Sequence, residues 1–465
     1  MILTLEQILK VTGGNLVRGG GKIFFQGIST DSRTVVEGDL FIALKGPHFD
    51  GHHYASEALR KKAGGVLIEE AKVGDIRSNG DRSNPVIAVK DTLTALGDIA
   101  RDWRRSHGTP VVGLTGSNGK TTTKEMIAVC LETTFPVLKT KGNLNNLIGV
   151  PLTLLGLTEK ERVVVLEMGM NVPGEIRRLT EIAEPDVGLI TNVHEVHLEG
   201  LGSVDRLKEE KGELFRRMRK DGTIVVNQDD PRVVDLASQY PGQKITFGME
   251  HPADVMAKEI RLGSEGTSFT LILEGEAMEI HLPLFGRHFV PNALSAVAIA
   301  SLFGVEVRRI KESLEKVQPF PMRMEVLRLK GGKTLINDAY NANPHSTELA
   351  LETLAEAKGE GRAIAVLGDM LELGNFAKEA HEEIGKKVSE LSIDFLVTMG
   401  EEAATVVESA FRHGYPTKSA KVVKSHSEAI SLLRGMIQDG DWILVKGSRR
   451  MAMEKIAEGL AEGRD

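Results

Sequence analysis

A glycine-rich segment at residues 113–122, with the sequence GLTGSNGKTT, constrains the fold of this chain more than any other feature. An apolar pair precedes the segment and a helix-like run follows it, so the pattern predicts a strand, a phosphate-binding loop and a helix. Main-chain N–H groups of such a loop can surround phosphate oxygens, and the start of the helix adds a partial positive charge. Lys120 is placed to reach the outer phosphates, and Thr121 to bind Mg²⁺. The segment therefore predicts nucleoside triphosphate chemistry.

The spacing of this loop departs from the usual pattern. A glycine normally stands five residues before Gly119, but that position is Leu114, and the glycines present are Gly113 and Gly116. An ordinary glycine-rich turn is the alternative interpretation. Phosphate binding is favoured because a lysine and a hydroxyl side chain directly follow the last glycine.

Length, charge and cysteine content narrow the class of protein. The 465 residues suggest about three domains, since single cores rarely grow beyond that scale. A net charge of -7 argues against a nucleic-acid binder, which needs a basic field. The single cysteine, Cys130, excludes an internal disulfide, fits a reducing compartment and is expected to pack as a small apolar residue. The start of the chain shows no secretory signal, and the longest apolar run, residues 294–305, is too short to span a bilayer, so we expect a cytoplasmic protein without membrane insertion.

The chain divides into three α/β regions, which we place at residues 1–106, 107–317 and 318–465. A proline pair at residues 319–321 discourages helix and suits a hinge between the last two regions. Residues 255–285 alternate in character around two glycines, which predicts an antiparallel addition to the middle sheet. Elsewhere the apolar patterns predict helices at 5–11, 93–105, 294–303 and 377–388, and strands at 41–44, 65–68, 111–115, 163–167, 187–192, 223–227, 334–337, 363–367, 395–399 and 443–445.

Several polar residues follow predicted strands of the middle region. Ligands collect beyond the carboxyl ends of parallel strands, so we expect these side chains to converge. Glu167 ends one strand and offers the oxygen ligand that Mg²⁺ prefers. His194 and Lys211 could complete a second cation site, although an isolated histidine or helical lysine is often only a surface or capping residue. His288 and Asn292 stand four residues apart and could read a base edge if a helix has begun there, or cap that helix.

Other candidates lie in the outer regions. Arg323 and Asp338 follow the hinge, where a guanidinium can bridge phosphate oxygens and a carboxylate can accept ribose hydroxyl protons. Polar turns at residues 29–33 and 45–52 have enough donors for a nucleotide or sugar, but plain loop chemistry also explains them.

Five segments together resemble the Mur ligase family. They are TGSNGKTT at 115–122, GNLNNLIGVP at 142–151, the segment containing Glu167, PMRME at 321–325 and DAYNANP at 338–344. The resemblance spans all three regions. It implies a three-domain α/β architecture with a small N-terminal domain that binds a UDP-sugar, a central ATPase-like parallel sheet with the phosphate loop, and a Rossmann-like C-terminal domain.

The resemblance also implies a reaction. The 338–344 run, the segment LGDMLELG at 367–374 and residues 142–146 are similar to the branch of the family that joins D-alanyl-D-alanine to UDP-N-acetylmuramoyl-tripeptide in the cytoplasm. That step belongs to peptidoglycan precursor synthesis, and so to cell wall formation, cell shape and division. ATP would phosphorylate the terminal carboxylate of the tripeptide, and the dipeptide amine would displace phosphate from the acyl phosphate. A carboxylate is a poor electrophile until one oxygen becomes such a leaving group, so cations and N–H donors must be in position.

Individual roles follow from the same resemblance. Lys120 would hold the β- and γ-phosphates, Thr121 and Glu167 one Mg²⁺, and His194 the second. Lys211 falls where the family often carries a carbamylated lysine, which would turn a cation into an anionic ligand. Arg323 would contact the γ-phosphate, Asn292 the adenine and Asp338 the ribose. The nucleotide-binding set is Gly116, Ser117, Asn118, Gly119, Lys120, Thr121, Thr122, Asn292, Arg323 and Asp338. The set for the UDP-muramoyl-peptide is Asp31, Ser32, Arg33, Pro47, His48, Asn143, Asn145 and Asn146.

The implied partners are the two substrates, ATP and Mg²⁺, with no nucleic acid, and the chain is expected to act as a monomer. For the dipeptide the candidates are residues 446–449 and 369–374. Nothing in the sequence distinguishes lysine from diaminopimelate as the third peptide residue.

Three other functions are alternatives to this one. Another amide ligase of the superfamily would add an earlier peptide residue, or glutamate to a folate; the hundred residues before the loop argue against the folate version. A regulatory GTP-binding switch would need an Asn-Lys-x-Asp guanine reader, and the chain contains no Asn-Lys pair. A catalytically silent sugar-nucleotide binder is disfavoured by Lys120, Thr121 and Glu167, which such a protein would not need.

Overall fold

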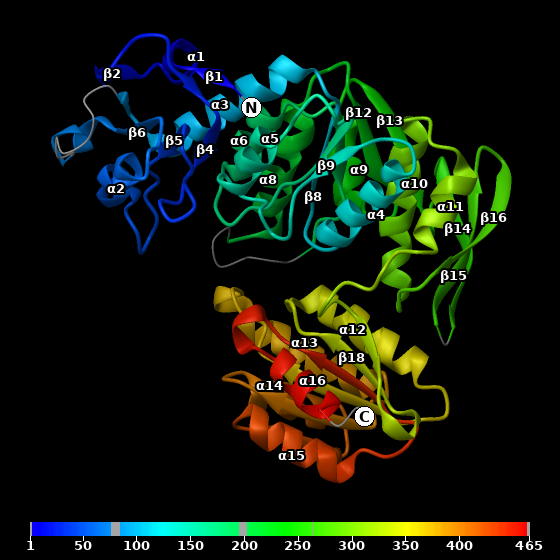
Figure 1. The fold of residues 1–465 in the computed structure, drawn as a ribbon. Helices are drawn as coiled ribbons and strands as arrows, with labels where there is room; N and C mark the ends of the chain where they lie inside the picture. Colours follow the sequence, from blue (N-terminus) through cyan, green and yellow to red (C-terminus); the bar gives the residue numbers. More distant parts are fainter. Residues whose placement is uncertain (1, 76–83, 195–201, 264, 463–465) are drawn as a thin grey trace.

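Each third of the chain builds its own β-sheet. The computed structural model describes residues 2–75, 84–194, 202–263 and 265–462. In Figure 1 the N-terminal part, in blue, lies beside the central part, in cyan to green, and the C-terminal part, in yellow to red, faces the central part. The predicted α/β class is confirmed, with sheets whose strands are mostly parallel.

The N-terminal sheet has the strand order β2-β7-β6-β5-β4, in which β2 is antiparallel and the others are parallel. Its strands are β2 (Asn15–Arg18), β4 (Gly27–Ser29), β5 (Asp39–Ile42), β6 (Gly65–Glu69) and β7 (Val86–Val89), with a separate pair of β1 (Leu3–Thr4) and β3 (Phe24–Phe25). The helices are α1 (Leu5–Thr12), α2 (Ala55–Arg60) and α3 (Thr92–His107), with 3₁₀ turns η1 (Gly51–Tyr54) and η2 (Glu70–Asp75). Helix α3 begins at a cap in which Asp91 accepts from the Thr94 N–H, and ends at Gly108 with φ 62°.

The central sheet has the order β16-β15-β14-β13-β12-β11-β8-β10-β9. Its strands are β8 (Val111–Thr115), β9 (Val137–Lys139), β10 (Val163–Glu167), β11 (Val187–Ile190), β12 (Thr223–Asn227), β13 (Gln243–Gly248), β14 (Val255–Gly263), β15 (Gly266–Leu273) and β16 (Glu276–Leu282). Its helices are α4 (Lys120–Glu132), α5 (Gly149–Leu155), α6 (Glu175–Ala183), α8 (Val204–Arg217), α9 (Pro231–Ser238), α10 (Val290–Leu302) and α11 (Val307–Leu314), with η3 (Arg287–Phe289). Strand β15 runs antiparallel to both of its neighbours, β14 and β16, which confirms the predicted antiparallel addition.

The core of this part explains the apolar sequence runs. All five residues of β8 are buried, and its neighbours β10 and β11 are also buried throughout, as expected for a parallel sheet covered on both faces. Helix α10 is buried along nearly its whole length because it packs between α4 and the sheet. Cys130 lies fully inside this core, and burial raises the pKa of its thiol to about 12, so it packs as the apolar residue the sequence predicted.

The C-terminal sheet has the order β17-β18-β22-β19-β20-β21, with β17 antiparallel at one edge. Its strands are β17 (Glu325–Arg328), β18 (Thr334–Asp338), β19 (Ala363–Gly368), β20 (Phe395–Met399), β21 (Ala420–Val423) and β22 (Trp442–Lys446). Its helices are α12 (Pro344–Ala357), α13 (Ala377–Glu390), α14 (Ala403–Arg412), α15 (His426–Met436) and α16 (Glu454–Ala461), with η4 (Lys330–Gly332), η5 (Gly374–Phe376), η6 (Thr417–Ser419) and η7 (Arg449–Met451).

Two predicted boundaries differ from the structure for local reasons. The strand expected at 187–192 ends at Ile190, because Thr191 and Asn192 turn to hydrogen-bond the carbonyl of Asn118. The helix expected at 294–303 begins earlier, at Val290, with Pro291 in its first turn, where proline's missing N–H costs nothing. Asn292 therefore lies inside the first turn of α10. In the part of the chain that the structure describes, no helix is both long and apolar enough to cross a membrane.

Helix α3 is joined to the central sheet by a buried arginine. The Arg104 guanidinium donates to the carbonyls of Ala183 and Glu184, both at 3.0 Å, and to Asp186 Oδ2 at 2.8 Å. Arg105 pairs with the Glu184 carboxylate from a side chain that is about half exposed. Arg104 thus supplies hydrogen-bond donors to the carbonyl groups and the carboxylate of the turn that leads into β11.

We expect Arg104→Ala to lower the free energy of unfolding by about 2 to 4 kcal/mol, because it removes charged hydrogen bonds from one buried and two partly buried acceptors. Arg105→Ala is the matched control and should cost at most about 1 kcal/mol, since exposed ion pairs contribute little. Urea denaturation followed by circular dichroism measures both. Equal losses in the two variants would contradict this account of the joint.

Candidate active site

The phosphate loop is shaped by two glycines with positive φ between β8 and α4. Gly116 has φ 153° and Gly119 has φ 78°. A Cβ on Gly116 would lie 1.8 Å from Thr191 Oγ1, and one on Gly119 would lie 2.6 Å from Asn292 Oδ1. The unusual position of the first glycine has a simple cause: Leu114 is a fully buried strand residue and is not part of the loop.

The chain after β11 clamps the loop in place. Ser117 N donates to Asn192 O and Asn118 N donates to Asn192 Oδ1, each at 2.9 Å. Ser117 Oγ bonds the main chain of His194, donating to O at 2.8 Å and accepting from N at 2.9 Å. The N–H groups of the first turn of α4 remain for a ligand, because a helix leaves its first donors without internal acceptors.

Lys120 folds back over the loop. Its Nζ donates to Gly116 O at 2.8 Å and to Ser117 O at 3.2 Å. Burial lowers the pKa of Lys120, Glu167 partly offsets this, and the charge of Arg323 lowers the pKa further. The ammonium is therefore held by carbonyls alone, at the place where phosphate oxygens would give it charged partners.

Glu167, at the end of β10, has one satisfied and one unsatisfied oxygen. The side chain is 2 % exposed. Oε1 accepts from Asn145 Nδ2 at 2.8 Å, whereas Oε2 is buried without a hydrogen-bond partner in the described structure. A buried carboxylate oxygen in this state is costly unless a cation approaches it. The donor set therefore fits a hard cation such as Mg²⁺.

His194 and Lys211 contact the phosphate loop from the chain that follows β11. Lys211 Nζ donates to Gly116 O at 2.9 Å, and burial, with repulsion from Lys120, lowers the pKa of Lys211 well below its usual value. Burial lowers the pKa of His194 to about 4, helped by His345, whose ring stacks on it with centroids 3.7 Å apart. Within the described residues these side chains do not gather with others into a cluster of three or more His, Cys, Asp or Glu ligands.

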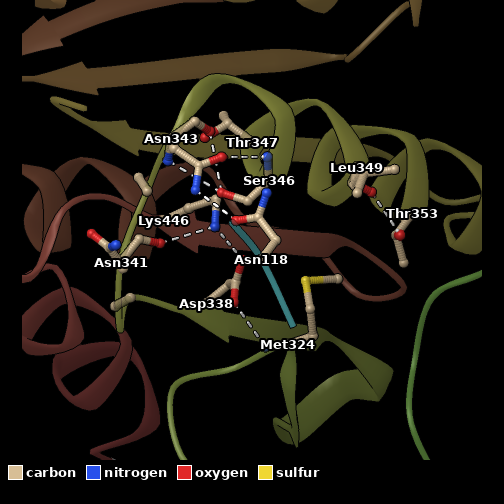
Figure 2. A network of polar contacts seen from close by, with 12 residues as sticks. Asn118, Met324, Asp338, Asn341, Asn343, Ser346, Thr347, Leu349, Thr353 and Lys446 are labelled. Carbon is tan, nitrogen blue, oxygen red and sulfur yellow. Dashed lines mark hydrogen bonds and ion pairs between the residues drawn. The ribbon is translucent and has the colours of Figure 1, made fainter. Parts of the chain in front are cut away.

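The C-terminal part reaches the loop directly. Asn343 Nδ2 donates to Asn118 Oδ1 at 2.7 Å, a contact drawn at the centre of Figure 2. Arg323 donates to Thr121 Oγ1 at 3.3 Å and lies over the ring of Tyr340, 3.9 Å from its centroid.

Asp338 is fixed within its own sheet, as Figure 2 also shows. Its Oδ1 accepts from Met324 N at 3.0 Å, and its Oδ2 pairs with the buried Lys446. The same ammonium donates to Asn341 O at 3.0 Å.

These residues enclose a cleft of about 300 Å³ between the central and C-terminal parts. The predicted site residues that line it are Ser117, Asn118, Gly119, Lys120, Thr121, Thr122, Asn143, Asn145, Glu167, Asn292, Arg323 and Asp338. Gly116, His194 and Lys211 are not among the residues that line the cleft. Asn146 does not line the cleft either, and its Oδ1 accepts from the N–H groups of Ile148 and Gly149 at the start of α5.

The candidate dipeptide segments meet at the opposite wall of the cleft. Leu371 N donates to Ser448 Oγ at 2.8 Å, and Ser448 N donates to Asp369 O at 3.0 Å. Residues 371–373 and 448–450 line the cleft. The two loops therefore form one surface that faces the phosphate loop.

The candidate UDP residues lie in the N-terminal part, away from this cleft. Asp31 and Arg33 form an exposed ion pair at 2.7 Å, and the hydrogen bond from Arg33 lowers the pKa of Asp31 to about 2. Lys61 donates to Ser32 O at 2.8 Å. Pro47 and His48 are exposed.

Sequence reasoning missed Asn192, Lys124 and His345. Asn192 was taken as the end of a strand, and its clamp on the loop depends on long-range register. Lys124 did carry a signal, since it stands one helical turn after Lys120 in a run whose other residues are mostly apolar.

Comparison with known proteins agrees with this geometry. Three family models match the chain: "Mur ligase family, catalytic domain" at residues 25–104, "Mur ligase middle domain" at 114–300, and "Mur ligase, glutamate ligase domain" at 322–449. The chain belongs to the Mur ligase family.

Two curated relatives carry the name UDP-N-acetylmuramoyl-tripeptide--D-alanyl-D-alanine ligase. The protein from Bacillus subtilis is 36% identical and the one from Escherichia coli 35%, each over 99% of this chain and 98% of the relative. A crystal structure of MurF from Acinetobacter baumannii has a TM-score of 0.90 at 32% identity and covers 99% of both chains. MurF ligase from Thermotoga maritima in complex with ADP has a TM-score of 0.82 at 30% identity, covering 94% of this chain and 97% of that one. The three-domain Mur ligase architecture expected from the sequence is confirmed.

His288 should make the stability of the fold depend on pH. Burial, with the charges of Lys446 and His345, lowers the pKa of His288 to about 3, and its Nδ1 is buried without a hydrogen-bond partner among the described residues. In the unfolded chain the ring takes up a proton near its ordinary value of 6.5. The stability that the neutral ring contributes is therefore present above that value and is lost as the pH falls toward 3.

Acidification from neutral pH to about pH 4 should lower the free energy of unfolding of His288→Gln by less than it lowers that of the unaltered protein. We expect the two losses to differ by up to about 3 kcal/mol. Urea denaturation at the two pH values measures the difference. The same acid-induced loss in both proteins would show that the ring is not held neutral in the fold.

Proposed function

We propose that this protein is an ATP-dependent amide ligase that joins D-alanyl-D-alanine to UDP-N-acetylmuramoyl-tripeptide, with release of ADP and phosphate. The observation that carries the proposal is the convergence of the phosphate loop, Glu167 and Arg323 on one cleft that also borders the Asn143–Asn145 segment. The names of the relatives, which match this chain along almost its whole length, support the choice of substrates. The ADP complex of a similar ligase supports ATP as the nucleotide.

The arrangement suits transfer of a phosphoryl group to a carboxylate. Lys120 and the first turn of α4 supply donors for the phosphates, and Arg323 approaches from the C-terminal part. We assign the adenine to Asn292, which lies against Gly119, and the ribose to Asp338. Closure of the C-terminal part over the loop would exclude water from the acyl phosphate until the amine attacks.

Mg²⁺ is a proposed cofactor, and it would neutralise charge on the transferring phosphoryl group. Glu167 would hold it through its unsatisfied Oε2, with Thr121 nearby, and His194 would hold a second ion. We place the UDP-sugar on Asp31, Ser32, Arg33, Pro47 and His48, the muramoyl-peptide on Asn143, Asn145 and Asn146, and the dipeptide on the surface formed by residues 369–374 and 446–449.

We further propose that the chain divides functionally into residues 1–106, 107–317 and 318–465, and that it works as a monomer in the cytoplasm.

Phosphate release tests the function. The purified protein, given ATP and Mg²⁺ with UDP-muramoyl-tripeptide, should release phosphate in a manner that depends on both the tripeptide and D-alanyl-D-alanine. Lys120→Ala should lower the rate at least about a hundredfold, because it removes a cation from the developing phosphoryl charge. The exposed lysine of α1 provides the control, and Lys10→Ala should retain the full rate. A fully active Lys120→Ala protein would overturn the site assignment.

Lys211 has two alternative roles, as a carbamate that binds metal or as an anchor for the loop. Burial and the charge of Lys120 lower the pKa of Lys211, which favours the neutral amine, and a neutral amine can add to carbon dioxide and lose a proton to give an anionic carbamate. A carbamate would have to turn away from Gly116 O, which Lys211 Nζ contacts. The alternative role is a plain anchor for the loop.

If Lys211 acts as a carbamate, Lys211→Ala should lose about tenfold or more in rate and recover part of it when acetate or formate is added, since these restore a carboxylate near the metal. Lys120→Ala, measured in the same buffers, should gain nothing. Lack of rescue in Lys211→Ala would identify the residue as a loop anchor.

A further inference from the structure

Lys124 is a fully buried cation beneath the site, with a side chain that is 0 % exposed. It lies on α4, one turn after Lys120. Removing an ammonium from water is costly unless partners replace the lost solvation. An ammonium on the buried face of a core helix therefore needs hydrogen-bond acceptors or carboxylates within contact distance.

The partners of Lys124 belong to the segment that carries the candidate muramoyl-peptide residues. Its Nζ donates to Thr140 O at 2.7 Å and to Gly142 O at 3.4 Å. Asn143 and Asn145, which follow directly, line the cleft. The buried ammonium thus fixes the base of that segment.

The same segment holds the candidate metal ligand, so the contacts close a ring. Glu167 N donates to Thr140 Oγ1 at 3.1 Å, and Asn145 Nδ2 donates to Glu167 Oε1 at 2.8 Å. Lys124 Nζ lies 3.9 Å from Glu167 Oε2. That separation is too long for a hydrogen bond, so the ammonium attracts this oxygen without occupying it.

A second carboxylate balances the charge of Lys124. Glu125 Oε1 lies 2.9 Å from Lys124 Nζ, and Glu125 Oε2 accepts from Lys139 at 2.7 Å. Burial alone would raise the pKa of Glu125, but the hydrogen bonds from Lys139 and Lys124 lower it. Glu125 is therefore ionised and offsets Lys124, which leaves the charge of Glu167 available to a cation in the cleft.

We propose that Lys124 is a positioning residue that couples the muramoyl-peptide segment to the metal-binding carboxylate. Because it ties the carbonyls of Thr140 and Gly142 to the same point that faces Glu167 Oε2, a shift of the segment moves the carboxylate with it. The roles given to the muramoyl-peptide segment and to Glu167 rest on the proposed function. The contacts that join the segment, Lys124 and Glu167 do not depend on it.

The proposal predicts a selective defect. Loss of the ammonium should loosen residues 142–149 and weaken the site for the UDP-muramoyl-tripeptide, while the dipeptide surface, built by the C-terminal part, keeps its geometry. A merely structural lysine would instead lower stability without distinguishing between the two substrates.

The test compares Lys124→Met with Lys139→Met. Lys139 shares Glu125, but among the described residues its side chain forms no hydrogen bond or ion pair with Thr140, Gly142 or Glu167, so it is the matched control. Amide hydrogen exchange of the ligand-free proteins should be about tenfold or more faster at residues 142–149 in Lys124→Met only, the size of one lost charge-assisted hydrogen bond. The KM for the tripeptide should rise by a similar factor, with the KM for D-alanyl-D-alanine within about twofold of the unaltered protein.

Lys124→Met leaves Glu125 and Glu167 less well paired, so the variant could fail to fold. The double variant Lys124→Met/Glu125→Gln removes the surplus negative charge and should fold, with the same exchange and KM pattern. Unchanged exchange at 142–149, or an equal rise in both KM values, would overturn the coupling. If the unaltered protein shows no ligase activity, the proposed function fails instead, and the exchange comparison still decides the role of Lys124.

Discussion

The site depends on the clamp between the phosphate loop and the chain that leaves β11. Strands β8 and β11 are parallel neighbours, with Ile190 opposite Thr115, so the residues after each strand meet at the same sheet edge. Asn192 accepts hydrogen bonds from two N–H groups of the loop, and Thr191 occupies the space that a side chain at position 116 would need. A loop with two positive-φ glycines would otherwise have many conformations, and the clamp selects one of them before any ligand binds.

The C-terminal part completes the site through contacts with that rigid loop. Asn343 and Arg323 reach Asn118 and Thr121, two residues expected to serve the nucleotide. These contacts are polar, and each donor or acceptor in them could be exchanged for one on a ligand at little cost. The two parts also pack apolar residues against each other, including Phe285 and Trp442 with ring centroids 5.8 Å apart, so polar and apolar contacts together hold the walls of a cleft that must admit ATP and two further substrates.

The sequence predicted the parts of the site that depend on local pattern. The β8 strand, the loop and α4 follow from apolar runs and glycine spacing within about twenty residues, and Glu167 follows from a buried strand that ends in an acid. The role of Asn146 stays a prediction, because its Oδ1 accepts from Gly149 N, and an amide in a loop can bond the first turn of a helix as well as face a substrate. Lys124 could not be placed, since its partners at Thr140 and Gly142 are main-chain carbonyls, which no residue type reveals. The stacking of His345 on His194 joins two domains, and only the tertiary fold brings those rings together.

The electrostatics of the loop point to an anionic ligand. Two lysines, Lys120 and Lys211, donate to the same carbonyl of Gly116, and burial together with their mutual repulsion lowers the pKa of Lys211. Arg323 adds a further positive charge that lowers the pKa of Lys120. Such a concentration of like charge is unfavourable by itself, and the nearby Glu167 offsets only part of it. A polyphosphate in the cleft would reverse these terms: its negative charge would favour the protonated form of Lys120 and offset the repulsion from Arg323. A polyphosphate thus offsets the repulsion among Lys120, Lys211 and Arg323, and that gain contributes to its binding.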